Sequence, residues 1–206
     1  MNSEVAKKIV LATRNAHKAE ELSRILNDLH SDVEVLTVAD FPDAPEVEET
    51  ESTFVGNAFL KARALMQFTG LPAVADDSGL CVDALDGSPG IFSARYSGAT
   101  ENVDQANLQL VLQNLQGVPK EKRGARFVCA AVLVTPNGEE VAEEGVVEGT
   151  IRIEPAGENG FGYDPIFEPT GFAITTAQMS AEEKDAISHR GQALRQLAKS
   201  ISALIP

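Results

Sequence analysis

The order of apolar and polar positions in the first forty residues predicts a β-α-β unit. Residues 9–12 are a short, wholly apolar run, and residues 33–38 have the composition of a second strand. Between them, apolar residues at 19, 22, 26 and 29 recur at helical spacing, which predicts a helix over residues 15–29. Strands separated by a helix favour an α/β sheet with right-handed crossovers.

The rest of the chain adds helices and a hairpin to this unit. The expected segments are a helix over 54–68, a strand over 72–75, an alternating stretch over 81–85, a helix over 103–115, and strands over 125–135 and 140–153 joined by a turn at 136–138. Ser180 and Glu183 form a capping box that starts a helical region to Leu204, with an interruption near Gly191. Because the hairpin breaks a simple doubly wound pattern, we expect an α/β fold with a mixed sheet, as one domain over residues 1–206 with two lobes.

The charge of the chain limits its partners. The formal net charge is −14, which argues against a nucleic acid or an anionic membrane as partner, because both attract basic surfaces. No apolar run approaches the roughly 20 residues of a membrane span. A small anionic ligand remains possible, since a local group of Lys and Arg can oppose the overall field. Cys81 and Cys129 lack metal-like spacing, which is typical of a reducing cytoplasm.

Asp76 and Asp77 are the clearest candidates for chemistry. They are adjacent, follow the apolar segment 72–75 and precede Ser78 and Gly79. Adjacent carboxylates repel each other, so a purely structural role suits them poorly. A pair at a strand end can hold a divalent cation or activate a water. The alternative is an exposed acidic turn.

Two further segments carry groups that suit a phosphate. Thr13, Asn15 and Lys18 lie at the start of the first predicted helix, where N–H groups and the helix dipole favour an anion. The alternative for this segment is an ordinary N-cap with a solvated Lys18. Lys61 shares a helix face with Asn57, four residues earlier, and either reaches a phosphate or is solvated.

The last third of the chain contains candidates for binding a base. Phe161 lies between two glycines, which suits a ring that stacks on a base, although a tight turn with a buried ring is as plausible. Asp164 precedes Pro165, so we expect an extended backbone and a carboxylate that is free to accept hydrogen bonds. His189 and Arg190 follow a helical segment that contains Lys184. Together they offer several hydrogen-bond donors, or else form a charged helix with one structural histidine.

These motifs occur in an order that resembles one known family. The chain is similar to the noncanonical purine nucleoside triphosphate pyrophosphatases, also called the inosine triphosphatase or Ham1-like family. The resemblance extends from Thr13 to about Leu194 through the runs T-R-N-A-H-K, E-E-T-E-S-T-F-V-G-N-A-F-L-K-A, A-D-D-S-G-L, P-G-I-F-S-A-R-Y-S-G, F-G-Y-D-P-I-F and E-E-K-D-A-I-S-H-R-G-Q-A-L.

The resemblance implies an enzyme that hydrolyses ITP, dITP and XTP to the monophosphate and pyrophosphate with Mg²⁺. It also implies a homodimer and an elongated mixed sheet, with a substrate cleft between two lobes. Asp77 would be the catalytic acid–base residue and would hold the metal with Glu49, although Glu48 is close enough to be confused with Glu49. The residues that it assigns to the substrate are Thr13, Arg14, Asn15, Lys18, Lys61, Ser78, Phe161, Gly162, Tyr163, Asp164, Lys184, His189 and Arg190.

Three other functions remain as alternatives. A Maf-like nucleotide pyrophosphatase would share the architecture and differ in its preferred base. A noncatalytic nucleotide sensor would bind the same ligand without turnover, but it would not need the acid pair at Asp76 and Asp77. An interaction scaffold with an acidic surface would leave the ordered motifs unexplained.

Overall fold

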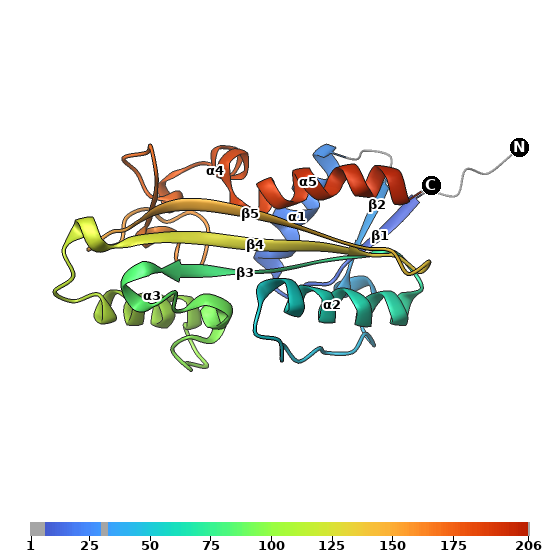
Figure 1. The fold of residues 1–206 in the computed structure, drawn as a ribbon, viewed down its shortest axis with the longest axis horizontal. Helices are drawn as coiled ribbons and strands as arrows, with labels where there is room; N and C mark the ends of the chain where they lie inside the picture. The colour runs from blue at the N-terminus through green and yellow to red at the C-terminus, as the bar shows by residue number, and fades with distance from the viewer. Residues whose placement is uncertain (1–6, 30–32, 206) are drawn as a thin grey trace, which may run out of the picture. The chain divides into compact units, whose positions relative to one another are not determined.

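The computed structural model describes residues 7–29 and 33–205. Its helices and strands are β1 (Lys7–Leu11), α1 (Ala16–Leu29), β2 (Val33–Thr37), α2 (Phe54–Thr69), β3 (Ala73–Val82), α3 (Val103–Asn114), β4 (Gly124–Val134), β5 (Glu140–Ile151), β6 (Phe167–Pro169), α4 (Ala181–Ile187) and α5 (His189–Leu204) (Figure 1). The strand order is β2-β1-β3-β4-β5-β6. Strand β1 is parallel to β2 and β3, whereas β5 and β6 are antiparallel. The predicted α/β fold with a mixed sheet is therefore confirmed.

Three local features differ from the sequence prediction. Strand β3 is continuous over Ala73–Val82, where two separate segments were expected. The helical region after Ser180 breaks at Ser188, whose backbone is extended, and not at Gly191, which lies within α5. A single glycine in a helix costs only about 1 kcal/mol relative to Ala and does not by itself break the helix. Strand β6 was not predicted, because three residues are too few to show a period.

The chain divides into two compact units. Unit 1 contains Met1–Asp77, Ala130–Glu144 and Arg190–Pro206, and unit 2 contains Ser78–Cys129 and Gly145–His189. Strands β3, β4 and β5 supply residues to both units. No helix in the described part of the chain is long and apolar enough to cross a membrane.

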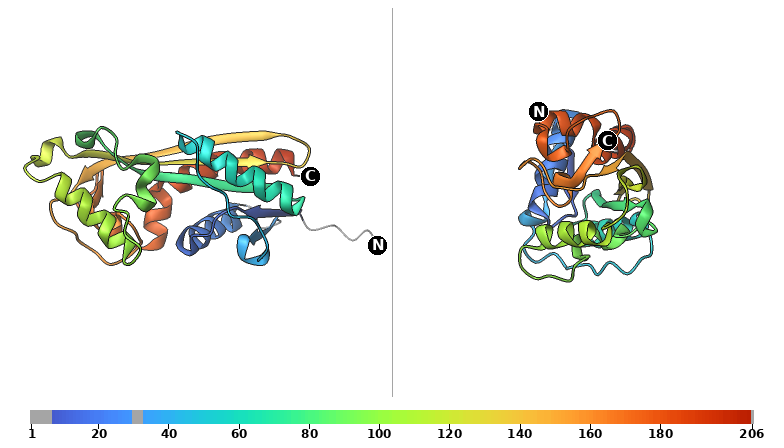
Figure 2. Two further views of the ribbon diagram at one scale, coloured as in Figure 1. Left: turned by 90° about the horizontal axis from the view of Figure 1, so that it is seen from below. Right: turned by 90° about the vertical axis from the view of Figure 1, so that its left-hand side faces the viewer.

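In unit 1, helices cover both faces of the sheet. Helix α2 lies on one face, and α1 and α5 lie on the other (Figures 1 and 2). The core on the α2 side includes Ala58, Ala62 and Leu65 of the helix. The core residues contributed by β1 and the position directly after it, by β3 and by β4 alternate along the chain, as a pleated sheet requires, and are Val10, Ala12, Ala73, Ala75, Val132 and Val134.

In the sheet, β2 lies on one side of β1 and β3 lies on the other. The chain therefore leaves β1 toward one edge of the sheet and returns on its other side, which makes β1 a topological switch point. Crevices at such switch points, beyond the carboxyl ends of the strands, are preferred ligand sites in α/β proteins. The register pairs Leu11 with Val74, and the Ala12 N–H donates to the Val74 carbonyl at 2.8 Å. The loop that follows β1 therefore runs alongside Asp76 and Asp77.

Unit 2 has its own core, built around α3. The helix buries Leu108, Val111 and Leu115 against strand residues that include Leu80 and Phe127. The segment that follows β5 completes this core with Tyr163, Ile166 and Phe167. This core supports the glycine loop at residues 160–162.

Candidate active site

Asp76 and Asp77 project from opposite faces of β3. Successive side chains alternate along a strand, and Ala75 packs against the α2 core, so Asp77 faces α2 and Asp76 faces α1 and α5. Asp76 accepts from Lys18 of α1, and Asp77 accepts from Asn57 of α2. The two carboxylates therefore repel each other less than their adjacency in the sequence suggests, because each has its own partners on its own face of the strand.

The Asp76 face is a buried network of opposite charges. Asp76 Oδ2 lies 3.0 Å from Lys18 Nζ and 3.4 Å from Arg190 Nε, and Arg190 Nη1 lies 2.9 Å from Glu21 Oε2. Burial disfavours the charged carboxylate, but the attraction of Lys18 and Arg190 outweighs burial and holds the pKa of Asp76 well below its usual range. At neutral pH, Asp76 is therefore an ionised partner for the two cations.

The Asp77 face has a different electrostatic balance. Lys61 Nζ lies 3.0 Å from Glu49 Oε1 and 3.5 Å from Asp77 Oδ1. Burial opposes the charge of the ammonium, but the surrounding carboxylates, Asp77 foremost, outweigh burial and raise the pKa of Lys61. Burial also raises the pKa of Asp77, and Lys61 and Lys18 offset that effect only in part. A buried carboxylate with a raised pKa beside a cation is a candidate general base.

Glu49 and Asp77 form a donor set that fits Mg²⁺. Their oxygens both approach the Lys61 ammonium, so they surround a position that already favours a cation. Glu49 is half-buried whereas Glu48 is exposed, which favours Glu49 as the second ligand. Among the described residues, no group of three or more His, Cys, Asp and Glu is placed to hold a metal. Two carboxylates still suit Mg²⁺, which usually completes its shell with waters and substrate phosphates.

The predicted phosphate residues lie at the start of α1. Asn15 Oδ1 accepts the Lys18 N–H at 3.1 Å, as an N-cap does, and Thr13 Oγ1 accepts the Asn15 N–H at 3.3 Å. Arg14 donates to the Ala44 carbonyl at 2.6 Å, which ties this loop to residues 41–44. The alternative of a solvated Lys18 is wrong, because its side chain is only 15% exposed and pairs with Asp76.

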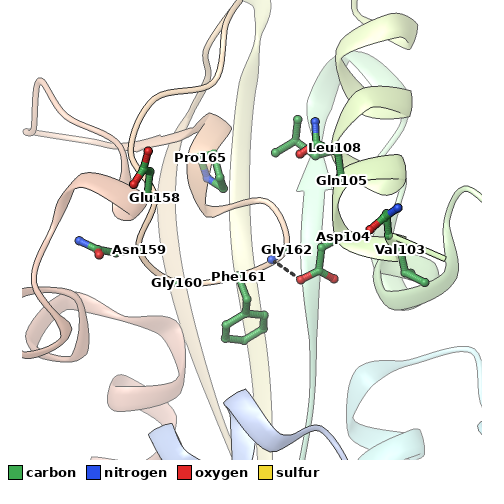
Figure 3. A pocket seen from close by; sticks show the side chains of 11 residues that line it. Val103, Asp104, Gln105, Leu108, Glu158, Asn159, Gly160, Phe161, Gly162 and Pro165 are labelled. Atoms are coloured by element: carbon green, nitrogen blue, oxygen red, sulfur yellow. Dashed lines mark hydrogen bonds between the residues drawn. The ribbon is translucent and has the colours of Figure 1, made fainter.

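In unit 2, the glycine loop borders a pocket of about 470 Å³ (Figure 3). Gly162 N–H donates to Asp104 Oδ2 of α3 at 2.9 Å, and the half-buried Phe161 extends its ring from the loop. Gly160 has a positive φ of +74°, and a Cβ there would collide with the Asp164 carboxylate. The residues that line the pocket are Asn102, Val103, Asp104, Gln105, Leu108, Glu158, Asn159, Gly160, Phe161, Gly162 and Pro165.

Asp164 is buried, and its carboxylate is fully engaged. It accepts from Lys184 Nζ at 2.6 Å, from Thr176 Oγ1 at 2.8 Å and from the Phe161 N–H at 2.9 Å. The expectation of a free carboxylate is wrong, and so is the extended backbone, because Asp164 opens a single 3₁₀ turn with Pro165. Asp164 therefore orders the loop. It also places Lys184 Nζ 5.0 Å from the centroid of the Phe161 ring, within cation–π range.

Two other candidates, Tyr163 and His189, also have partners within unit 2. The Tyr163 hydroxyl donates to the Ser93 carbonyl at 2.8 Å, and burial raises the pKa of Tyr163. His189 is buried and stacks on Phe127, with ring centroids 4.9 Å apart and an interplanar angle of 9°. Ser78 is half-buried on β3, directly after Asp77.

The structure also adds residues that the sequence analysis did not assign to the site. Asn57 contacts Asp77, Glu21 pairs with Arg190, and Asp104 holds the glycine loop. Asn57 shares a helix face with Lys61, which is the one signal that pointed toward it. Glu21 lies three residues after Lys18 on the same helix, but nothing local indicates its partner in α5.

The comparisons with known proteins agree with this fold. The sequence profile of the Ham1 family matches residues 9–200. The dITP/XTP pyrophosphatase of Streptomyces avermitilis is 52% identical over 198 residues, which cover 96% of this chain and 98% of the relative. Among solved structures, the Ham1 protein of Staphylococcus aureus has a TM-score of 0.84 at 40% identity, covering 96% of this chain and 99% of that one. A nucleoside-triphosphatase, dITP/XTP pyrophosphatase, of Mycobacterium abscessus has a TM-score of 0.75 at 53% identity, covering 92% of this chain and 98% of that one. The chain belongs to the Ham1 family.

Proposed function

We propose that the protein hydrolyses noncanonical purine nucleoside triphosphates, ITP, dITP and XTP, to the monophosphate and pyrophosphate. The observation that carries the proposal is the group formed by Glu49, Lys61 and Asp77, in which two carboxylates meet one ammonium beside the loop after β1. The choice of substrate rests on the relatives, which are named dITP/XTP pyrophosphatases and match nearly the whole chain.

Different residues bind the two ends of the substrate in this proposal. The polyphosphate is bound by the cationic side chains of Lys18 and Lys61 and by the loop at residues 13–15. The purine stacks on the Phe161 ring, and Gly162, Tyr163 and Asp164 frame the loop that carries this ring. Ser78 contacts the substrate next to Asp77.

The proposed reaction is an in-line attack of water on the α-phosphorus. Asp77 accepts a proton from the water as its oxygen bonds to phosphorus, and the bond from the α-phosphorus to the bridging oxygen breaks. The electron pair leaves with pyrophosphate, whose charge Lys61 and Lys18 help to neutralise. Glu49 and Asp77 would hold Mg²⁺, which when bound supplies further positive charge to the phosphates.

Selection of the base is assigned to Lys184, His189 and Arg190. Donors at these positions suit the 6-oxo group of hypoxanthine and xanthine, whereas adenine presents an amino group there and leaves donors unpaired. Such a mismatch can reduce kcat/KM by roughly 10⁴-fold or more. Guanine shares the 6-oxo group, so its rejection must depend on the 2-position. In the structure Arg190 also pairs with Asp76 and Glu21.

The proposal also covers the oligomeric state, the partners and the cellular location of the enzyme. The resemblance supports a homodimer, and the net charge of −14 argues against nucleic acid and membrane partners. Cys81 and Cys129 do not form a disulfide, which is consistent with a cytoplasmic location.

Pyrophosphate release from ITP, dITP, XTP, GTP and ATP, measured in parallel with Mg²⁺, tests the function. Fast release from the first three with little from GTP and ATP is the expected result. Orthophosphate in place of pyrophosphate would move the cleaved bond and contradict the mechanism. A different preferred base would favour a Maf-like specificity, and tight binding without turnover would favour a sensor.

A further inference from the structure

Asn57 is a buried amide in the first turn of α2 with a partner on each side. Its side chain is 0% exposed. Nδ2 donates to Asp77 Oδ2 at 3.2 Å, and Oδ1 accepts the backbone N–H of Glu51 at 3.0 Å. One amide group therefore connects β3 to the acidic loop that precedes α2.

The two segments that Asn57 connects carry the two carboxylates proposed to hold Mg²⁺. Glu51 lies two residues after Glu49, so the hydrogen bond to its N–H restrains the backbone that presents Glu49. The loop also packs closely on the helix, because a Cβ at Gly56 would lie 2.7 Å from Glu51 Cβ. Asn57 thus acts at the point where the loop meets the helix.

The helix holds Asn57 firmly in this position. Thr53 caps α2 by accepting the Gly56 N–H at 3.1 Å, and the Asn57 N–H donates to the Thr53 carbonyl at 3.1 Å. An amide nitrogen can only donate and an amide oxygen can only accept, so the two contacts fix which end of the amide faces Asp77. The donation to Oδ2 leaves Oδ1 of Asp77 on the side of Lys61, which is also the side of Glu49.

We propose that Asn57 is a positioning residue for the reaction, which holds the Asp77 carboxylate and the Glu49 loop in one fixed relation. The proposal rests on the proposed function for its catalytic part. It assigns to Asn57 no contact with the substrate and no proton transfer. A group that orients metal-binding carboxylates typically changes metal affinity or activity by roughly 10–100-fold when it is removed.

Two variants separate this role from simple packing. Asn57→Ala removes both hydrogen bonds. Asn57→Asp keeps an acceptor for the Glu51 N–H but turns a carboxylate oxygen toward Asp77. For both, we expect kcat to fall roughly 10–100-fold and the Mg²⁺ concentration for half-maximal rate to rise, while KM for dITP stays close to the wild-type value.

Thr135→Val is the matched control within unit 1. Thr135 is also buried, and its hydroxyl accepts the Glu139 N–H at 3.2 Å in the β4–β5 turn. Among the described residues, the hydrogen bonds of this hydroxyl involve Glu139, which is not a proposed site residue. The variant should lose stability and keep kcat. If Asn57→Ala keeps the wild-type kcat, or if Thr135→Val loses kcat equally, the positioning role is overturned.

A double-mutant cycle gives a readout that does not depend on activity. Unfolding in urea is measured without metal for wild type, Asn57→Ala, Asp77→Ala and the double variant. A direct hydrogen bond predicts that the changes in unfolding free energy are non-additive. Additive changes would overturn the proposal. If wild type releases no pyrophosphate from any nucleotide, the proposed function fails, and the cycle still decides whether Asn57 positions Asp77.

Discussion

Strand β3 has an aspartate on each face, and the pKa values of these two residues are shifted in opposite directions. On the face toward α1 and α5, Asp76 lies between Lys18 and Arg190, and its pKa is held well below the usual range. On the face toward α2, burial raises the pKa of Asp77, which shares the ammonium of Lys61 with Glu49. Two adjacent residues can thus have separate roles, because successive side chains of a strand point to opposite faces of the sheet. Asp76 balances buried cations, and Asp77 is the carboxylate suited to proton transfer.

The largest expected effect is the loss of catalysis in Asp77→Asn. The amide keeps the shape of the side chain but cannot accept a proton from water, so kcat should fall by roughly 10²–10⁴-fold. Circular dichroism and pyrophosphate release measure fold and rate on the same sample. A folded Asp77→Asn protein with magnesium-dependent activity near wild type would contradict the role of Asp77.

Removal of the Arg190 cation on the opposite face of β3 should lower the stability of the fold. Arg190→Met leaves Asp76 and Glu21 buried without their shared guanidinium, which costs about 3–5 kcal/mol of unfolding free energy. The control is Arg63→Met, because the Arg63 and Glu140 side chains are 46% and 35% exposed and such a pair contributes about 0–1 kcal/mol. Urea unfolding at neutral pH measures both.

The same variant tests base selection by Arg190. If Arg190 reads the base, Arg190→Met lowers kcat/KM for ITP more than for ATP. Equal losses for both nucleotides would show that the residue serves the phosphates or the network around Asp76.

A smaller effect should distinguish the two neighbouring glutamates. Glu49→Gln removes the charge of one of the two carboxylates proposed to hold Mg²⁺, so the Mg²⁺ concentration for half-maximal rate should rise by roughly tenfold or more. Glu48 is exposed, and Glu48→Gln should leave this concentration unchanged. The reverse pattern would assign the metal contact to Glu48.

The smallest effect is a difference in the pH dependence of stability, measured without metal. The lowered pKa of Asp76 means that its stabilising effect is present above its ordinary value of 3.8 and is lost as the pH falls through the folded-state value. The advantage of wild type over Asp76→Asn should therefore shrink in acid. Asp77 has the opposite sign, because a raised pKa favours the protonated form in the folded state. Asp77→Asn should thus gain stability relative to wild type as the pH rises from acid to neutral. Parallel pH curves for the two variants would contradict the comparison.

Local sequence patterns predicted much of the fold. The β-α-β start, helices α2 and α3, and the β4–β5 hairpin all follow from periodicity and turn residues, which act over a few positions. The Ser180 capping box was also confirmed, with the Glu183 N–H donating to Ser180 Oγ at 3.2 Å. The prediction divided β3 into two segments because the polar residues at the centre of the strand interrupt the pattern of apolar positions. Burial of that centre depends on cations that come from other elements.

The partners within the site could not be predicted in the same way. Arg190 and Glu21 are 169 positions apart, and Asn57 and Asp77 are 20 apart, so no local period links them. Asp164 was expected to be free because the sequence does not show that Lys184 and Thr176 meet its carboxylate. The sequence indicated which residue types the chemistry needs, and the fold determined their pairing.

The most direct test compares Asp76→Asn and Asp77→Asn side by side, with kcat for dITP and the unfolding free energy measured for each. The account predicts that Asp77→Asn loses most of its kcat and remains folded, and that Asp76→Asn loses stability but keeps far more of its kcat. An active Asp77→Asn protein, or an Asp76→Asn protein that is fully stable and inactive, would contradict the division of tasks between the two faces of β3.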